Sequence, residues 1–336
     1  MEYFERIDKE LLGLSFSAWL DDVAERVLVF LDERDGGIVE KPYKTRFTHS
    51  EYVEYLLARY EEAWKKAGAQ YEEGVFLTIT LPPIFSLKDE QYLLSYMLHR
   101  LRNLLRRRYG FTPPSIVSNE PQERLNFHKA CVFFGIGRIM DKRELTEGLD
   151  DKVIRFLSEM GRHIQKTINK RLTSEEVKEL NRYGRRLLKR YKKYKRKHPG
   201  YSGPVNWITK IYKEGDRWVF GNPPPDLQGN RSARALYDGG DATLPDYLKK
   251  YLVKNLKVLK SGFADDDVKL AWYWLLRIPF YTVSPSLRDR REKPPPVGLK
   301  FIGSYHASWL EYEMAWTFRL KGGGRSGIRA YIHVCI

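Results

Sequence analysis

The sequence is poor in cysteine and has no long apolar run. Cys131 and Cys335 are the only two thiols in 336 residues, which excludes a disulfide framework and a zinc site built on cysteine alone. No apolar stretch reaches the length that a bilayer span needs, and the charged segment from Met1 to Lys9 precedes no signal-peptide core. We therefore expect a cytoplasmic protein that does not associate with membranes.

Several catalytic motifs are absent as well. The chain has no G-x-x-x-x-G-K-[ST] phosphate loop, no H-E-x-x-H zinc motif and no nucleophile elbow, so the sequence supports neither an ATPase nor a zinc peptidase. Glutamine occurs five times, whereas lysine, arginine and glutamate are abundant. That balance is typical of a protein from a thermophile.

Acidic residues are too few to balance the basic ones. The chain has 59 Lys and Arg against 43 Asp and Glu, a net charge of +16, which favours a polyanionic partner such as nucleic acid. The segment from Arg182 to His198 holds ten Lys and Arg, no acid and three tyrosines. Its cations could neutralise phosphates while its tyrosines stack on bases; the alternative is a solvated helix face without a partner. The DNA-binding candidates are Arg185, Arg186, Lys189, Arg190, Lys192 and Lys193.

The pattern of apolar residues predicts an α+β fold. Apolar, β-branched runs at 75–81, 115–120 and 126–135 predict strands, and the short turn between the last two makes them antiparallel. Helical periodicity on either side predicts flanking helices rather than a doubly wound α/β fold. The expected domains are an N-terminal helical region at 1–70, a central domain at 71–290 with a basic helical insertion at about 146–200, and a strand-rich C-terminal segment at 291–336.

One predicted helix carries an unusual set of side chains. Tyr247, Lys250, Tyr251 and Lys254 follow each other at i, i+3, i+4 and i+7, so they share a helix face. A tyrosine oxygen is a poor nucleophile at its usual pKa of about 10, and a neighbouring ammonium group favours the phenolate. The face is therefore a candidate catalytic site, and an ordinary amphipathic helix is the alternative.

A second candidate site combines a carboxylate with an imidazole. Glu120 ends one predicted strand, and His128 lies on the next with Asn126 and Ala130 on the same face. Imidazole and carboxylate, completed by water, can bind Mn²⁺ or Mg²⁺. A structural histidine that is merely hydrogen-bonded is the alternative.

Three segments, taken in order, resemble the motifs of rolling-circle replication initiators of the HUH endonuclease superfamily. They read FLTITLPP at Phe76–Pro83, EPQERLNFHKACVFFG at Glu120–Gly135 and YLKKYLVK at Tyr247–Lys254. The resemblance is closest to Rep proteins of archaeal plasmids and viruses with two tyrosines. It implies an antiparallel sheet with a metal-binding strand at its centre and the tyrosine helix alongside. It also implies a metal-dependent nuclease that nicks single-stranded origin DNA through a covalent 5′-phosphotyrosine and rejoins it.

Carried across, the resemblance assigns Tyr251 to the motif tyrosine, Tyr247 to its partner one turn earlier, and Lys250 and Lys254 to the motif lysines. The sequence departs from the family at the histidine pair. If His128 is the first histidine, Ala130 replaces the second; if His128 is the second, Asn126 replaces the first. Either way one imidazole is missing, and the expected site is depleted, held by His128, Glu120 and water.

The depleted site leaves two functions open. The first is a nicking-joining enzyme, and the second is a weakened or inactive protein that binds origin DNA and recruits replication factors. An RNA-binding accessory protein that uses the basic segment is a third. No helicase segment follows the tyrosine motif, so unwinding is expected to come from a host helicase or from a C-terminal extension, and a host polymerase is expected as a further partner.

Overall fold

The computed structural model describes residues 9–121, 127–137, 141–168, 172–201, 203–221, 244–261, 268–288 and 298–306. The chain divides into two compact units. The larger, here called the core unit, comprises Met1–Gly13 and Ser50–Arg291, and the smaller comprises Leu14–His49 and Glu292–Ile336. The fold mixes helices with antiparallel sheets and is α+β, as the sequence predicts.

The small unit contains a sheet of which the sequence predicted only the C-terminal strand. Helix α1 (Lys9–Ala24) enters this unit, and the strands β1 (Arg26–Asp32), β2 (Ile38–Pro42) and β9 (Leu299–His306) form an antiparallel sheet in the order β2-β1-β9. The expectation that 1–70 is helical throughout is therefore wrong. Strand β1 pairs with β9 from the other end of the sequence, and local periodicity carries no information about such a distant partner.

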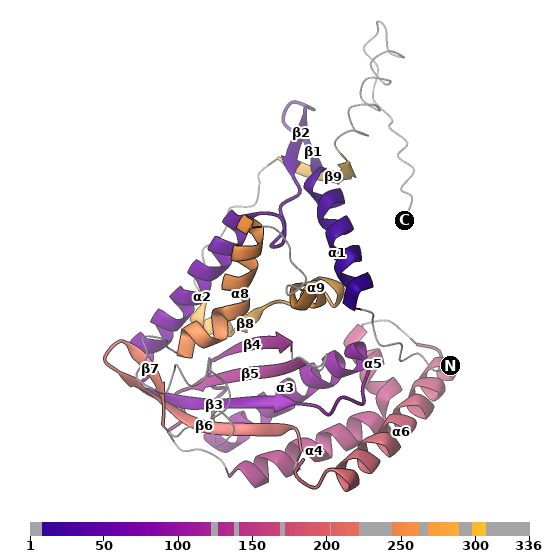
Figure 1. The fold of residues 1–336 in the computed structure, drawn as a ribbon, viewed down its shortest axis with the longest axis vertical. Helices are drawn as coiled ribbons and strands as arrows, with labels where there is room; N and C mark the ends of the chain where they lie inside the picture. The colour runs from indigo at the N-terminus through magenta and orange to yellow at the C-terminus, as the bar shows by residue number, and fades with distance from the viewer. Residues whose placement is uncertain are drawn as a thin grey trace, which may run out of the picture. The chain divides into compact units, whose positions relative to one another are not determined.

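The core unit is built on a six-stranded antiparallel sheet in the order β7-β6-β3-β5-β4-β8 (Figure 1). The strands are β3 (Glu73–Thr80), β4 (Ser115–Pro121), β5 (Phe127–Phe134), β6 (Val205–Glu214), β7 (Arg217–Phe220) and β8 (Tyr281–Val283). Strand β5 lies between β3 and β4, and all three are almost completely buried. The predicted antiparallel pairing of β4 with β5 is confirmed.

Helices cover both faces of this sheet. Helices α2 (Ser50–Gln70) and α8 (Leu244–Ser261) pack on each other and on one face, where Trp64 of α2 meets Phe134 of β5 at 5.4 Å between ring centroids. Helices α3 (Leu87–Tyr109) and α4 (Lys142–Ser158) cover the other face. The other helical elements of the described residues are α5 (Met160–Ile168), α6 (Ser174–Lys197), α9 (Val268–Leu275) and the short η3 (Pro285–Leu287).

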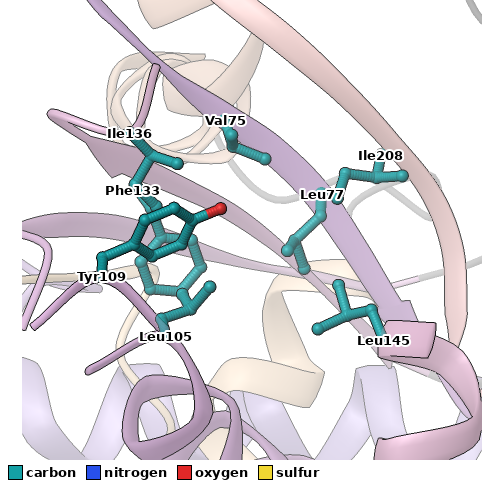
Figure 2. Close-up of a pocket in the computed structure, with 8 residues that line it drawn as sticks. All are labelled: Val75, Leu77, Leu105, Tyr109, Phe133, Ile136, Leu145 and Ile208. Atoms are coloured by element: carbon teal, nitrogen blue, oxygen red, sulfur yellow. The ribbon is translucent and has the colours of Figure 1, made fainter. Parts of the chain in front are cut away.

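Figure 2 shows the face of the sheet that α3 and α4 cover, where a small cavity lies between the sheet and these two helices. Leu105 and Tyr109 of α3 and Leu145 of α4 point toward Leu77 and Phe133 of the strands. The lining side chains are apolar apart from the Tyr109 hydroxyl. This cavity is a packing gap in the core, because a single hydroxyl cannot supply the several polar groups that orient a ligand.

Close contact between helices holds α6 against α4. Gly184 of α6 faces Leu157 and Met160, and a Cβ atom at position 184 would lie 2.2 Å from the Leu157 carbonyl oxygen. Leu187 and Tyr191, one and two turns later, are fully buried. The basic segment is thus one side of a packed helix, and glycine is required where the two backbones approach most closely.

We expect Gly184→Ala to destabilise the protein by about 1–3 kcal/mol, because the added methyl group forces the helices apart. Without that contact, alanine would stabilise a helix by about 1 kcal/mol relative to glycine. Gly200→Ala is the matched control, because a Cβ atom there meets no heavy atom within 4 Å. Denaturant titrations measure both variants, and a Gly184→Ala protein as stable as wild type would contradict the packing.

Candidate functional site

The candidate metal-binding residues lie opposite each other on neighbouring strands. In the register of β4 and β5, Glu120 pairs with His128 and Ser118 pairs with Ala130. Because side chains alternate along a strand, these four share one face of the sheet. It is the face that α2 and α8 cover.

Glu120 and His128 form a hydrogen-bonded pair. The His128 Nε2 and Glu120 Oε2 atoms are 2.8 Å apart, and the side chains are 14% and 1% exposed. A carboxylate as buried as Glu120 needs a polar partner, because an uncompensated charge in the interior is costly. The pair therefore has a structural role in addition to any chemistry that it supports.

Helix α8 is attached to this same face. The Ser118 hydroxyl donates a hydrogen bond to the Leu248 carbonyl oxygen of α8 at 3.1 Å. The Tyr60 hydroxyl of α2 donates to the Pro245 carbonyl oxygen at 3.1 Å, and the Lys249 ammonium pairs with Glu61 at 2.9 Å. The first turns of α8 are thus held on the sheet next to the strand that carries His128. The sequence did not identify Ser118, whose role depends on a contact between residues 130 positions apart.

The buried side of α8 runs through Leu244, Leu248, Leu252 and Asn255. Leu248 and Leu252 anchor the helix, whereas Val253 is 46% exposed and does not. This difference follows from the 100° rotation per residue, which turns Val253 away from the buried stripe.

The predicted catalytic residues all belong to α8. The structure describes the backbone of Tyr247, Lys250 and Tyr251 but not their side chains, and the Lys254 side chain is partly buried. Position 251 follows Leu244 by seven residues and precedes Asn255 by four, so it lies at the border of the buried stripe, and positions 247 and 254 lie further round the helix.

The donor atoms of the Glu120–His128 pair suit a divalent ion, but two side chains are fewer ligands than such an ion needs. Imidazole nitrogen and carboxylate oxygen are ligands that Mn²⁺ accepts. Among the described residues, no group of three or more His, Cys, Asp and Glu is placed to hold a metal ion. Asn126, which would replace the first histidine as a metal ligand in one register, lies outside the described residues, and Ala130 is completely buried. The pair fits the depleted site predicted from the sequence, with water needed to complete it.

The opposite face of β5 carries a buried lysine that the sequence did not single out. The Lys129 ammonium donates to the Asn119 side-chain oxygen at 2.5 Å, and Glu90 of α3 accepts a hydrogen bond from the Phe127 backbone at 3.0 Å. Burial lowers the pKa of Lys129 to about 8 and raises the pKa of Glu90 to about 8. Both groups are separated by the sheet from His128, so they act on stability and not on the candidate site.

The free energy of unfolding is expected to fall as the pH rises from 4.5 to about 8, because an unfolded carboxyl group loses its proton near 4.5 while folded Glu90 keeps it. The slope from this group is at most roughly 1.4 kcal/mol per pH unit. Lys129 acts in the opposite direction above about pH 8, where its lowered pKa makes stability rise with pH.

The Glu90→Gln variant keeps an oxygen acceptor but has no proton to lose. Its free energy of unfolding should therefore depend less on pH below pH 8. Glu54→Gln, at an exposed position of α2, is the control and should leave the pH dependence unchanged. Denaturant titrations at the two ends of the range measure the difference. The same slope in wild type and Glu90→Gln would show that Glu90 is not its source.

The six predicted DNA-binding residues of α6 are all exposed. The predicted stacking role of the tyrosines is wrong for Tyr191, which is completely buried and donates a hydrogen bond to Asp150 at 2.5 Å. Its place in the helix puts it on the same stripe as Gly184 and Leu187. The sequence shows an aromatic residue among cations, but the helix period decides which side of α6 it occupies.

Comparison of the chain with protein-family models, with curated proteins and with solved structures found no match. Within the described part of the chain, none of the helices has the length and apolar character that crossing a membrane requires. The resemblance of the three segments therefore stays a prediction.

Proposed function

We propose that the chain initiates rolling-circle replication by nicking and rejoining single-stranded origin DNA, in a central domain at about 71–290. The observation that supports it most is the hydrogen bond between Ser118 and Leu248. It joins the helix of the third motif to the sheet face that carries the Glu120–His128 pair of the second. This contact brings together segments of the second and third motifs that are more than 100 residues apart in the sequence.

In the proposed reaction, the Tyr251 hydroxyl oxygen attacks the phosphorus of one phosphodiester. A bond forms between phosphorus and the tyrosine oxygen as the bond to the 3′ oxygen breaks; the phenol loses its proton, and the released 3′ oxygen gains one. The energy of the broken ester is kept in the phosphotyrosine, so rejoining needs no nucleotide. Tyr247 attacks the second junction in the same way and releases a second 3′-OH. That 3′ oxygen attacks the Tyr251 phosphotyrosine, so a bond forms between phosphorus and the 3′ oxygen as the bond to the Tyr251 oxygen breaks; the 3′-OH loses its proton, the phenol regains one, and the circle is closed.

The other site residues support that attack. Lys250 and Lys254 favour the phenolate and offset the charge that develops on the phosphate. His128 and Glu120 would hold a divalent ion, Mn²⁺ or Mg²⁺, which would polarise the scissile phosphate. Glu120 also orients the His128 ring through their hydrogen bond. A rise in melting temperature with Mn²⁺, lost in His128→Ala, would report that binding without any measurement of activity.

The small donor set favours a second candidate, a DNA-binding protein with weak or no nicking activity. Ala130 stands where one register of the family motif has histidine, and it is completely buried beside Ser118, which holds α8. A histidine introduced there would have to displace packed atoms. Restoring the family residue is therefore expected to disturb the fold rather than to create activity.

One experiment separates the two candidates. The protein is incubated with a pool of single-stranded oligonucleotides of randomised sequence, labelled at the 3′ end, in Mn²⁺ or Mg²⁺. A 5′-phosphotyrosine keeps the 3′ label on the protein through denaturing electrophoresis, and protease treatment releases it. The enzyme candidate predicts this adduct. Binding of the pool without any adduct in either metal selects the second candidate.

A further inference from the structure

Helix α6 is held by one side and presents the other to solvent. Its buried stripe consists of Gly184, Leu187 and Tyr191. The Tyr191 hydroxyl and the Lys195 ammonium both bind the Asp150 carboxylate of α4, at 2.5 Å and 2.7 Å. These contacts fix the rotation of the helix about its axis. The side that remains outward is therefore set by the fold.

The outward side is continuously basic. Nine exposed cations, here called the basic face, lie on it: Arg182, Arg185, Arg186, Lys189, Arg190, Lys192, Lys193, Arg196 and Lys197. With about 100° of rotation per residue, they centre roughly opposite the buried stripe. With 1.5 Å of rise per residue, the face is roughly 22 Å long. This gives a straight row of positive charge on a rigid support.

The aromatic residues of α6 are committed to contacts within the protein. Tyr191 is buried, and the Tyr183 hydroxyl donates a hydrogen bond to Asp89 at 2.7 Å. The Tyr194 ring stacks on His198 with 4.0 Å between centroids. Proteins that bind single strands combine cations with aromatic platforms on which bases stack. The nine positions of the basic face include no aromatic residue, because the helix period puts Tyr183, Tyr191 and Tyr194 on the side around the buried stripe.

We propose that the basic face binds the phosphate backbone of duplex DNA next to the nicked strand. Duplex DNA carries one charge per about 1.7 Å of its axis and keeps its bases stacked inside, so it matches a row of cations that lacks aromatic platforms. The contact reads no sequence, because it reaches phosphates and not base edges. The inference rests on the proposed function for the identity of DNA as the partner. It adds that α6 holds the duplex arm of an origin, while α8 acts on the single strand.

The test neutralises three outward positions that take no part in the contacts described above: Arg185→Gln, Lys189→Gln and Lys193→Gln in one protein. The control removes the same charge from the exposed end of α3 with Arg106→Gln, Arg107→Gln and Arg108→Gln. Fluorescence anisotropy measures binding to a duplex of roughly 25 base pairs and to one of its strands, between about 50 and 200 mM salt.

We expect the α6 variant to lose at least about tenfold in duplex affinity and to lower the salt slope by roughly 2 to 3, with about 0.9 per lost phosphate contact. Its affinity for the single strand should change by less than about threefold. In the α3 variant, the affinities for duplex and for single strand should both change little. An equal loss in the two variants would assign the effect to net charge and overturn the inference. An equal loss on single strands, or tighter binding of duplex RNA than of duplex DNA, would also overturn it.

The failure of this inference is distinguishable from failure of the proposed function. Adduct formation on the labelled single strands is measured separately, with the wild-type protein. A wild-type protein that forms no adduct but loses duplex affinity in the α6 variant would refute the nicking activity and leave the duplex contact. A wild-type protein that forms the adduct, with no loss of duplex affinity in the α6 variant, would refute the duplex contact and leave the nicking activity.

Discussion

Replacing Tyr251 by phenylalanine is expected to abolish the covalent adduct between the protein and single-stranded DNA. The change removes one oxygen atom, the proposed nucleophile, and leaves the ring in place. Loss of a nucleophile lowers turnover by at least roughly 10³-fold. The measurement is the yield of 3′-labelled, protease-sensitive adduct in Mn²⁺, with folding checked by circular dichroism.

Two matched variants make this result specific. Tyr52→Phe removes an exposed phenol from another helix of the core unit and should leave the adduct unchanged. Tyr247→Phe should keep the first adduct and lose the joined circle, because the second attack is then missing. If Tyr251→Phe keeps the adduct while Tyr247→Phe loses it, the order of the two tyrosines is reversed.

The second large effect is expected at His128. His128→Ala should lower the rate of adduct formation by roughly 10² to 10³-fold, the usual cost of removing a group that stabilises charge in the transition state. DNA affinity should change little, because the side chain is only 14% exposed and lies on the sheet face that α2 and α8 cover, whereas α6 packs on α4 of the other face. Single-turnover adduct formation at saturating DNA measures the rate apart from binding.

The variant also removes a hydrogen-bond partner of the buried Glu120 carboxylate, which costs about 1–3 kcal/mol in stability. Rates are therefore compared at a temperature where both proteins are folded. His99→Ala, at an exposed position of α3, is the control. Adduct formation at the wild-type rate in folded His128→Ala would remove the histidine from the reaction, and with it the metal site.

Much of the core unit could be predicted from the sequence, because its elements have strong local signals. The β-branched run in β3 and the alternation in β5 each predict a strand, and the amphipathic pattern of α3 predicts a helix. The short connection between β4 and β5 made their pairing predictable, and that pairing places Glu120 opposite His128.

What could not be predicted depends on contacts between distant residues. The sheet of the small unit joins β1 to β9, more than 250 residues later. Lys129 is buried because Asn119 and the α3 layer enclose it, although lysine is usually a surface residue. Tyr191 is buried because α6 turns that side toward α4, and a run of cations does not reveal the side that faces inward.

The central claim is that a tyrosine of α8 becomes joined to DNA, and peptide mapping of the adduct tests it most directly. Trypsin cuts after Lys249, Lys250 and Lys254, so Tyr247 and Tyr251 fall in different peptides. After nuclease trimming, mass spectrometry should find the 5′-phosphonucleotide on the peptide Tyr251–Lys254. A nucleotide on a serine, or on a tyrosine outside α8, would contradict the account.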